Sequence, residues 1–160
     1  MVLPSTNLLL PLPDPAATES LARACAAHLP PHQTVFLKGP IGAGKTHFAR
    51  AFIRARLGAE VEVPSPSFTL VQIYDTPDAP IYHADLYRLS DVSELTELGL
   101  FDAFGQAQCL IEWPEKLGHT APGGALTLAL AHEGEGRVAA LSGPLPPALV
   151  QALRPQAAKA

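Results

Sequence analysis

The feature that most constrains this chain is a glycine-rich octapeptide at residues 39–46, Gly-Pro-Ile-Gly-Ala-Gly-Lys-Thr. It matches the pattern GxxxxGK followed by Ser or Thr at every fixed position. It also follows an apolar run at 34–38 (TVFLK) and precedes a predicted helix at 46–57. In such a strand–loop–helix unit, backbone N–H groups and the positive end of the helix converge on phosphate oxygens. The pattern therefore predicts a nucleoside triphosphate site, with an ordinary glycine-rich turn as the alternative.

Each predicted contact of the octapeptide has a chemical reason. The backbone amides of Gly42, Ala43 and Gly44 are expected to bind phosphate oxygens. Lys45 is expected to place a cation between the β- and γ-phosphates. The hydroxyl of Thr46 is a hard oxygen ligand of the kind that Mg²⁺ prefers. The cofactors predicted from this segment are therefore ATP and Mg²⁺.

Length and composition favour a single folded domain. The chain has 160 residues, of which 48% are hydrophobic and 16% are charged, so it is apolar enough to bury a core. We expect one domain over residues 1–153 and a disordered tail over residues 154–160. The net charge of −4 argues against a broad basic face that would hold nucleic acid. A local basic patch, or a partner that holds the nucleic acid, stays open.

The cysteines and the early apolar run bear on location. Cys25 and Cys109 share no CxxC spacing, which favours reduced thiols over a metal site or a disulfide. The run 8–12 is broken by Pro11 and is too short to span a bilayer. We therefore expect a cytoplasmic protein without a membrane partner.

The order of apolar periodic segments indicates an α/β fold. We expect a three-layer arrangement like that of P-loop NTPases, with a mixed sheet that is parallel in the centre and antiparallel at its edges. Proline clusters separate the segments. Helices are predicted at 18–29, 46–57, 92–104 (broken at Gly99) and 146–154, and strands at 34–38, 68–74, 81–86, 108–113, 125–131 and 137–142.

Two acidic residues stand where a P-loop site needs carboxylates. Glu112 ends the apolar run Cys109 to Ile111, and Asp85 follows the residues Ile81 to Ala84. The carboxyl ends of neighbouring strands lie beside the phosphate loop, so both acids can reach a metal or an attacking water. The alternatives are a solvated strand-end acid for Glu112 and a helix N-cap for Asp85.

Three further features each have a functional and a structural interpretation. The segment 64–69 (PSPSFT) is either a nucleotide-sensing loop or a plain loop start. Trp113 either stacks on a base or packs in the core. Arg50, Arg54 and Arg56 form either a solvated helix face or a docking surface for an acidic partner or tRNA.

Four motifs in this order resemble the bacterial TsaE family, the YjeE-type P-loop ATPases. The resemblance covers roughly residues 18–142, and DLYR followed by IEWPE makes it specific. The motifs are GPIGAGKT (39–46), SPSFTL (65–70), YHADLYRL (82–89) and LIEWPE (110–115). The resemblance implies a small ATPase needed for N6-threonylcarbamoyladenosine at position 37 of certain tRNAs. It implies that ATP hydrolysis resets a TsaD–TsaB complex between turnovers, with tRNA bound indirectly through that complex.

The resemblance also assigns roles residue by residue. Lys45 matches the phosphate-binding lysine, Thr46 matches the Mg²⁺ ligand, and Glu112 matches an acid at the metal that also bears on hydrolysis. Asp85 matches the acid of the DLYR motif, near the γ-phosphate and the metal. The residues matched with catalysis are thus Glu112, Asp85 and Lys45.

Two further matches lie outside the strong motifs, and two positions depart from the family pattern. Thr18 and Arg137 match residues that approach the nucleotide, whereas from the sequence itself they are equally a helix N-cap and a solvated strand end. Pro40 stands where the family has an acid, and it lacks an N–H for phosphate. His47 replaces a second threonine, and its imidazole is the expected substitute contact to the nucleotide.

Two other functional classes share the same phosphate loop. A small-molecule kinase needs cations over the transferred phosphoryl group, and the chain beyond Arg56 contains only scattered ones. A nucleotide-binding subunit without turnover is the third class, because no arginine finger is evident in the chain. The expected activity is therefore ATP hydrolysis that is slow without partners.

Overall fold

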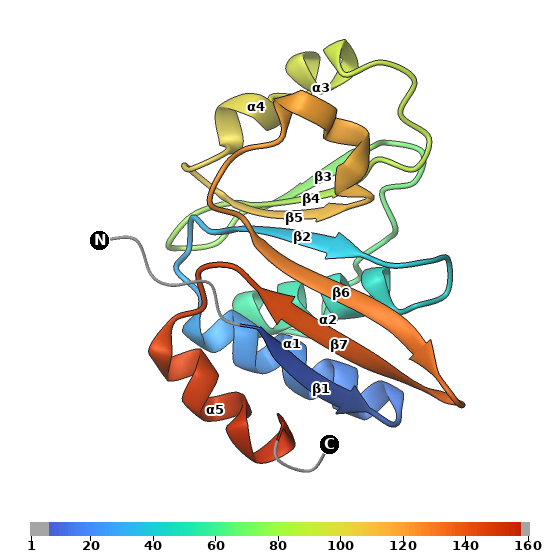
Figure 1. Ribbon diagram of the computed structural model, residues 1–160. Coiled ribbons are helices and arrows are strands. Elements are labelled where there is room, and N and C mark those ends of the chain that lie inside the picture. The colour runs from blue at the N-terminus through green and yellow to red at the C-terminus, as the bar shows by residue number, and fades with distance from the viewer. Residues whose placement is uncertain (1–6, 158–160) are drawn as a thin grey trace.

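The apolar run TVFLK forms β2 (Thr34–Lys38), the central strand of a seven-stranded sheet in the computed structural model, which describes residues 7–157. The strand order is β1-β7-β6-β2-β5-β4-β3 (Figure 1). The remaining elements in chain order are β1 (Leu8–Leu12), α1 (Pro15–His28), α2 (Lys45–Leu57), β3 (Val71–Tyr74), β4 (Ile81–Asp85), α3 (Ser93–Glu97), α4 (Leu100–Ala103), β5 (Gln108–Glu112), the 3₁₀ helix η1 (Pro114–Thr120), β6 (Leu126–Glu133), β7 (Gly136–Ser142) and α5 (Pro147–Ala157).

The sheet is mixed in the way the sequence predicts. β2 pairs in parallel with β5 and β6, and β4 pairs in parallel with β5. The edge pairs β1–β7, β6–β7 and β3–β4 are antiparallel. The α/β fold class and the parallel centre with antiparallel edges are thus confirmed.

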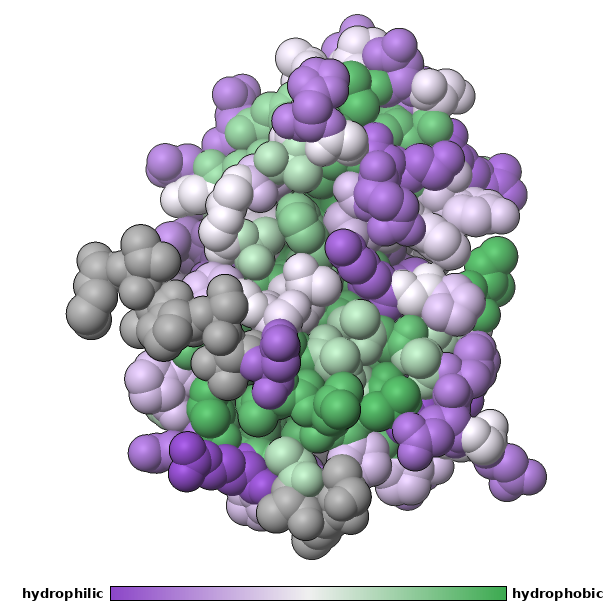
Figure 2. Space-filling view, viewed as in Figure 1, coloured by the Kyte–Doolittle hydropathy of each residue, from purple (hydrophilic) through white to green (hydrophobic). Residues whose placement is uncertain are grey.

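Helices cover the two faces of the sheet unequally. α1, α2 and α5 lie on one side, while α3, α4 and η1 cover β3, β4 and β5 on the other (Figure 1). Two separate hydrophobic clusters fill these layers. Hydrophobic side chains also gather in the lower part of Figure 2, where Figure 1 places β1 and β7 and no helix lies in front of them. Antiparallel strands tolerate such a bare face, unlike the parallel centre.

The first strand is one element that the sequence analysis missed. β1 contains Pro11, which lacks the N–H of a central strand, so the proline-rich start looked like a loop. Among the described strands, however, β1 pairs only with β7, and an edge strand accommodates a proline. The first helix likewise starts earlier than predicted. Asp14 is its N-cap, accepting a hydrogen bond from the Ala17 amide at 2.8 Å, and Pro15 occupies the first turn.

Two other boundaries also differ from the prediction. The strand predicted from Phe68 begins at Val71, because the Leu70 amide donates to the Pro66 carbonyl at 2.7 Å and closes a turn there. The tail predicted from residue 154 is helical as far as Ala157, because α5 buries Leu153 against the core. Residues 1–6 and 158–160 lie outside the described part of the chain.

The two cysteines are separate, buried thiols. Cys25 belongs to the cluster under α1 and Cys109 to the cluster on the other face of the sheet. Burial raises the pKa of each thiol to about 12. Within residues 7–157, no helix combines the length and hydropathy that a membrane crossing requires.

Candidate active site

The octapeptide connects the end of β2 to the start of α2, and its glycines fix its path. Gly39 has a φ of 143°, and a Cβ there would collide with the carbonyl oxygen of Leu130 on β6. Gly44 is the N-cap of α2 in the left-handed conformation, with a φ of 105°. Only glycine meets both conditions without strain. The sequence therefore encodes a tight loop at the N-terminus of α2, as a phosphate site requires.

Lys45 is the buried cation of this loop. Its ammonium donates hydrogen bonds to the carbonyls of Gly39 (2.6 Å) and Pro40 (2.9 Å), and it lies 4.1 Å from the centre of the Trp113 ring. Burial lowers the pKa of the ammonium, while the negative charges of Glu112, Asp85 and Glu115 oppose that shift. The hydrogen bonds to the Gly39 and Pro40 carbonyls hold the ammonium within the loop, where a triphosphate would approach.

Glu112 and Thr46 meet at the carboxyl edge of the sheet. Thr46 Oγ1 donates a hydrogen bond to Glu112 Oε1 at 2.7 Å, across 66 residues of sequence. The other carboxylate oxygen, Oε2, lies 2.7 Å from Nε2 of His83 on β4, and both side chains are buried. The Glu112 carboxylate is therefore held from both sides, with one oxygen beside the threonine hydroxyl.

Asp85 lies next to Glu112 because their strands are parallel neighbours in register. Its Oδ1 accepts a hydrogen bond from the Tyr87 amide at 3.0 Å, and its Oδ2 accepts one from Ser67 Oγ at 3.3 Å. The side chain is only 6% exposed. Asp85 thus caps the turn that follows β4 and ties the segment 64–69 to the same site.

Two cavities flank the loop. One, of about 360 Å³, is lined by Lys45 and Thr46 together with the two acidic residues Asp85 and Glu112. The other, of about 480 Å³, lies on the opposite side. Gly42, Gly44 and His47 line both cavities. The loop therefore separates an acidic compartment from a second, larger one.

The larger cavity contains the two weakly predicted residues. Thr18 lies within α1 and is buried, so its alternative as the N-cap of that helix is wrong. The guanidinium of Arg137 donates to the Gly42 carbonyl through Nε (3.3 Å) and Nη2 (3.0 Å). Arg137 therefore contacts the loop and is not merely a solvated strand end.

The sequence comparisons now decide the family. The family model described as "Threonylcarbamoyl adenosine biosynthesis protein TsaE" matches residues 12–139. The chain belongs to the TsaE family. TsaE of Rickettsia bellii is 45% identical over 66% of this chain and 73% of its own. TsaE of Bacillus subtilis is 37% identical over 76% of both chains.

A solved structure agrees with the family assignment. The crystal structure of Bacillus subtilis YdiB superposes with a TM-score of 0.74 at 26% identity, covering 95% of this chain and 97% of that one. The resemblance to TsaE and the P-loop NTPase-like fold are both confirmed. The family is described by its part in threonylcarbamoyladenosine biosynthesis.

The residues of this TsaE chain fit a nucleotide with Mg²⁺. Mg²⁺ is commonly bound through one or two carboxylates together with substrate phosphates and waters. Within residues 7–157, no three His, Cys, Asp or Glu side chains are grouped to hold a metal by themselves. Thr46 and Glu112 instead offer two oxygen donors beside the loop, so phosphate oxygens and waters would complete the coordination. This donor set fits a nucleotide-dependent Mg²⁺ site and not an independent metal centre.

His83 is the site residue that sequence reasoning did not single out. It is fully buried, it contacts Glu112, and its Nδ1 has no hydrogen-bond partner among the described residues. One signal was present: His83 lies two residues before Asp85 on a strand, so the two side chains share a face.

We expect His83→Leu to destabilise the fold by about 1–3 kcal/mol, because it removes one partner of a buried carboxylate. Urea unfolding followed by circular dichroism measures the change. His119→Leu, at an exposed position in η1, is the matched control and should leave the unfolding midpoint nearly unchanged. Equal midpoints for both variants would contradict a supporting role for the His83–Glu112 contact.

Proposed function

We propose that this TsaE chain binds and hydrolyses ATP with Mg²⁺ and thereby drives turnover of a TsaD–TsaB complex that makes threonylcarbamoyladenosine in tRNA. The observation that carries the proposal is the 2.7 Å hydrogen bond between Thr46 Oγ1 and Glu112 Oε1, with Asp85 on the neighbouring strand. Glu112 is positioned to hold Mg²⁺ beside the Thr46 hydroxyl, and Asp85 offers a second buried carboxylate for the attacking water. Family membership supports the tRNA-modification context.

The two compartments support separate roles for the residues. On the acidic side, Lys45 binds the β- and γ-phosphates, and Thr46 with Glu112 holds the metal. Mg²⁺, when bound, neutralises charge that develops on the phosphates. Asp85, on the adjacent strand, would orient the attacking water. On the other side, Thr18 and Arg137 line the cavity that would hold the nucleoside portion.

The small-molecule kinase is a weaker alternative in this geometry. Among the residues that line the acidic cavity, Lys45 is the only Lys or Arg. Arg88 lies over the Phe68 ring, 4.4 Å from its centre, and Arg137 is engaged with the loop carbonyl. A kinase lid that supplies several cations has no counterpart in these contacts. Incubation with labelled ATP distinguishes the two functions, since label in a small-molecule acceptor would favour the kinase and label in inorganic phosphate the ATPase.

An apolar rim beside the acidic cavity supports a partner that covers it. Ile41 and Tyr87 line the cavity and Phe68 follows Ser67, and these side chains are 70%, 49% and 81% exposed. Exposed large hydrophobic side chains grouped around a site are typical of an interaction surface. A partner seated there would also be able to contribute the second cation that the cavity lacks.

We therefore expect the TsaD–TsaB complex with tRNA to accelerate ATP hydrolysis by at least ~10-fold, because a cation supplied in trans stabilises the transferring phosphoryl group. Phosphate release is measured with the chain alone, with the complex, and with the complex and tRNA. An unchanged rate would contradict partner activation. The test of the whole proposal is whether the chain with ATP and Mg²⁺ restores multiple turnovers of tRNA modification to an otherwise complete reconstituted system.

A further inference from the structure

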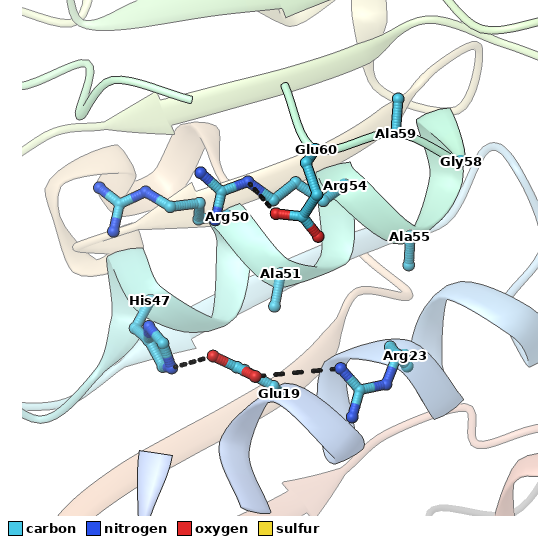
Figure 3. Close-up of a pocket in the computed structure, with 10 residues that line it drawn as sticks. All are labelled: Glu19, Arg23, His47, Arg50, Ala51, Arg54, Ala55, Gly58, Ala59 and Glu60. Atoms are coloured by element: carbon cyan, nitrogen blue, oxygen red, sulfur yellow. Dashed lines mark ion pairs between the residues drawn. The ribbon is translucent and has the colours of Figure 1, made fainter. Parts of the chain in front are cut away.

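A third cavity, of about 370 Å³, lies along α1 and α2 (Figure 3). We call it the α1–α2 groove. Ala51 and Ala55 of α2 form its floor, and Arg50 and Arg54 rise on one side of them. Glu19 and Arg23 of α1, with His47, form the opposite side, and Glu60 lies across the arginines. Small residues on the floor allow another chain to approach the helix backbone closely.

The two arginines of the groove are fixed by the protein backbone. Nε of Arg50 donates to the Val63 carbonyl at 3.0 Å, and Nε of Arg54 donates to the Val61 carbonyl at 2.9 Å. Both carbonyls belong to the segment after α2. The guanidinium groups are thereby oriented before any ligand binds, which reduces the entropy lost on binding.

The terminal nitrogens of these arginines remain available. Within residues 7–157, Arg50 forms no ion pair, and Arg54 forms one at 3.9 Å to Glu60, a side chain that is 91% exposed. Arg56 differs: its Nε and Nη2 bind the carbonyls of Ala26 (2.7 Å) and Leu29 (2.9 Å) beneath α1. The basic cluster read from the sequence is therefore a pair, Arg50 and Arg54, with Arg56 used in packing.

The spacing of this pair defines the chemistry of a ligand. Guanidinium groups bind carboxylates through paired N–H donors. Residues four apart on a helix have Cβ atoms ~5–6 Å apart, and alternate side chains of an extended chain are separated by about 6.6 Å. An extended peptide with acidic residues at alternate positions therefore matches Arg50 and Arg54.

The glutamates of the groove favour a peptide over a nucleic acid. Glu19 and Glu60 lie on opposite sides of the alanine floor. A nucleic acid strand carries a phosphate at every nucleotide and would place negative charge beside both of them. A peptide can place carboxylates at the arginines and neutral or basic side chains at the glutamates. The net charge of −4 also disfavours a nucleic acid.

We propose that the α1–α2 groove binds an extended acidic segment of a partner protein through Arg50 and Arg54. The inference rests on the proposed function, which identifies that partner as the TsaD–TsaB complex. The groove ends at His47, which also lines both nucleotide cavities. A segment bound in the groove thus lies next to the loop that contacts ATP.

The first test is charge reversal of the pair. The full-length chain carries a fluorescent label, and its binding to the TsaD–TsaB complex is followed by anisotropy at saturating ATP and Mg²⁺. The double variant Arg50→Glu/Arg54→Glu should raise the Kd for the complex at least ~10-fold. Arg154→Glu, an exposed arginine of α5, is the matched control and should change it by less than about twofold.

A second variant separates docking from folding, since the arginines also hold the segment 61–63. Ala55→Glu places a negative charge on the exposed floor without touching the arginine–carbonyl bonds. It should weaken binding of the complex by ~10-fold, whereas Gln151→Glu on the exposed surface of α5 should not. The affinity of each variant for a fluorescent ATP analogue should stay within about twofold of the original chain, which excludes an effect through the nucleotide site.

A third measurement identifies the class of ligand. A synthetic peptide with alternating Glu and Ala should bind the original chain and lose binding in the Arg50→Glu/Arg54→Glu variant. Selective binding of oligouridylate instead would overturn the inference in favour of RNA. If both groove variants bind the complex as the original chain does, the groove assignment fails while the proposed function stands. If the original chain does not bind the complex at all, the proposed function fails and this partner assignment with it.

Discussion

Replacing Lys45 with alanine is expected to weaken ATP binding by about 100-fold, the largest effect that a single side chain of this protein should have on affinity. The ammonium is buried within the loop, and two loop carbonyls and the Trp113 ring position it. A triphosphate bound by the loop would be left without its buried countercharge. Titration of a fluorescent ATP analogue in the presence of Mg²⁺ measures the change.

The control for this variant must separate binding from loop structure. Lys45→Ala removes the donor to the Gly39 and Pro40 carbonyls, so the thermal unfolding of the variant is measured alongside its affinity. Lys116→Ala removes an exposed lysine of η1 and should bind the analogue like the original chain. An affinity for Lys45→Ala within about threefold of the original would show that this lysine does not bind the phosphates.

The position of Lys45 was predictable because the motif is local. Eight consecutive residues specify the strand, the glycine turns and the helix start, and no distant contact is needed to interpret them. The approach of Glu112 to Thr46 is long-range, yet it was also predictable. Glu112 ends β5, and Thr46 follows β2 through the loop; these strands are parallel neighbours, so their carboxyl ends meet at one edge of the sheet.

What the sequence did not reveal depends on specific tertiary contacts. β1 is stable as a strand because β7 lies beside it, and nothing in the proline-rich start indicates that neighbour. Arg56 was grouped with Arg50 and Arg54, but its side chain turns toward α1 and packs against the Phe52 ring. The helical spacing places these arginines on α2, but it does not show which backbone carbonyls accept their hydrogen bonds.

His83 illustrates a different limit. A single histidine in a strand can pack in the core, lie at the surface or belong to a functional site. Its spacing from other polar residues does not distinguish these three roles. Only the fold brings its Nε2 to the carboxylate of Glu112. Local patterns therefore identified the residues proposed to bind the phosphates and the metal, and the family resemblance added Thr18 and Arg137. The residue that supports Glu112 required the structure.

Replacing Glu112 is expected to separate hydrolysis from binding. The Glu112 carboxylate lies beside the Thr46 hydroxyl, where it would hold the metal as charge moves onto the leaving phosphate. Its contribution should therefore be greatest in the transition state. We expect the kcat for hydrolysis to fall ~100- to 1000-fold in Glu112→Ala, with ATP affinity within about threefold of the original.

The choice of variant matters because Glu112 is also a partner of buried His83. Glu112→Ala leaves Nε2 of that histidine without its contact, so some of its loss could come from the fold. Glu112→Gln has nearly the same volume and keeps polar atoms facing Thr46 and His83 while removing the charge.

Glu115→Gln removes an exposed acid near Lys45 and serves as the control. Single-turnover hydrolysis is measured with the TsaD–TsaB complex present. A rate in Glu112→Gln equal to that of Glu115→Gln would exclude the Glu112 carboxylate from the chemical step, whereas a large loss in both Glu112 variants would assign the effect to its charge.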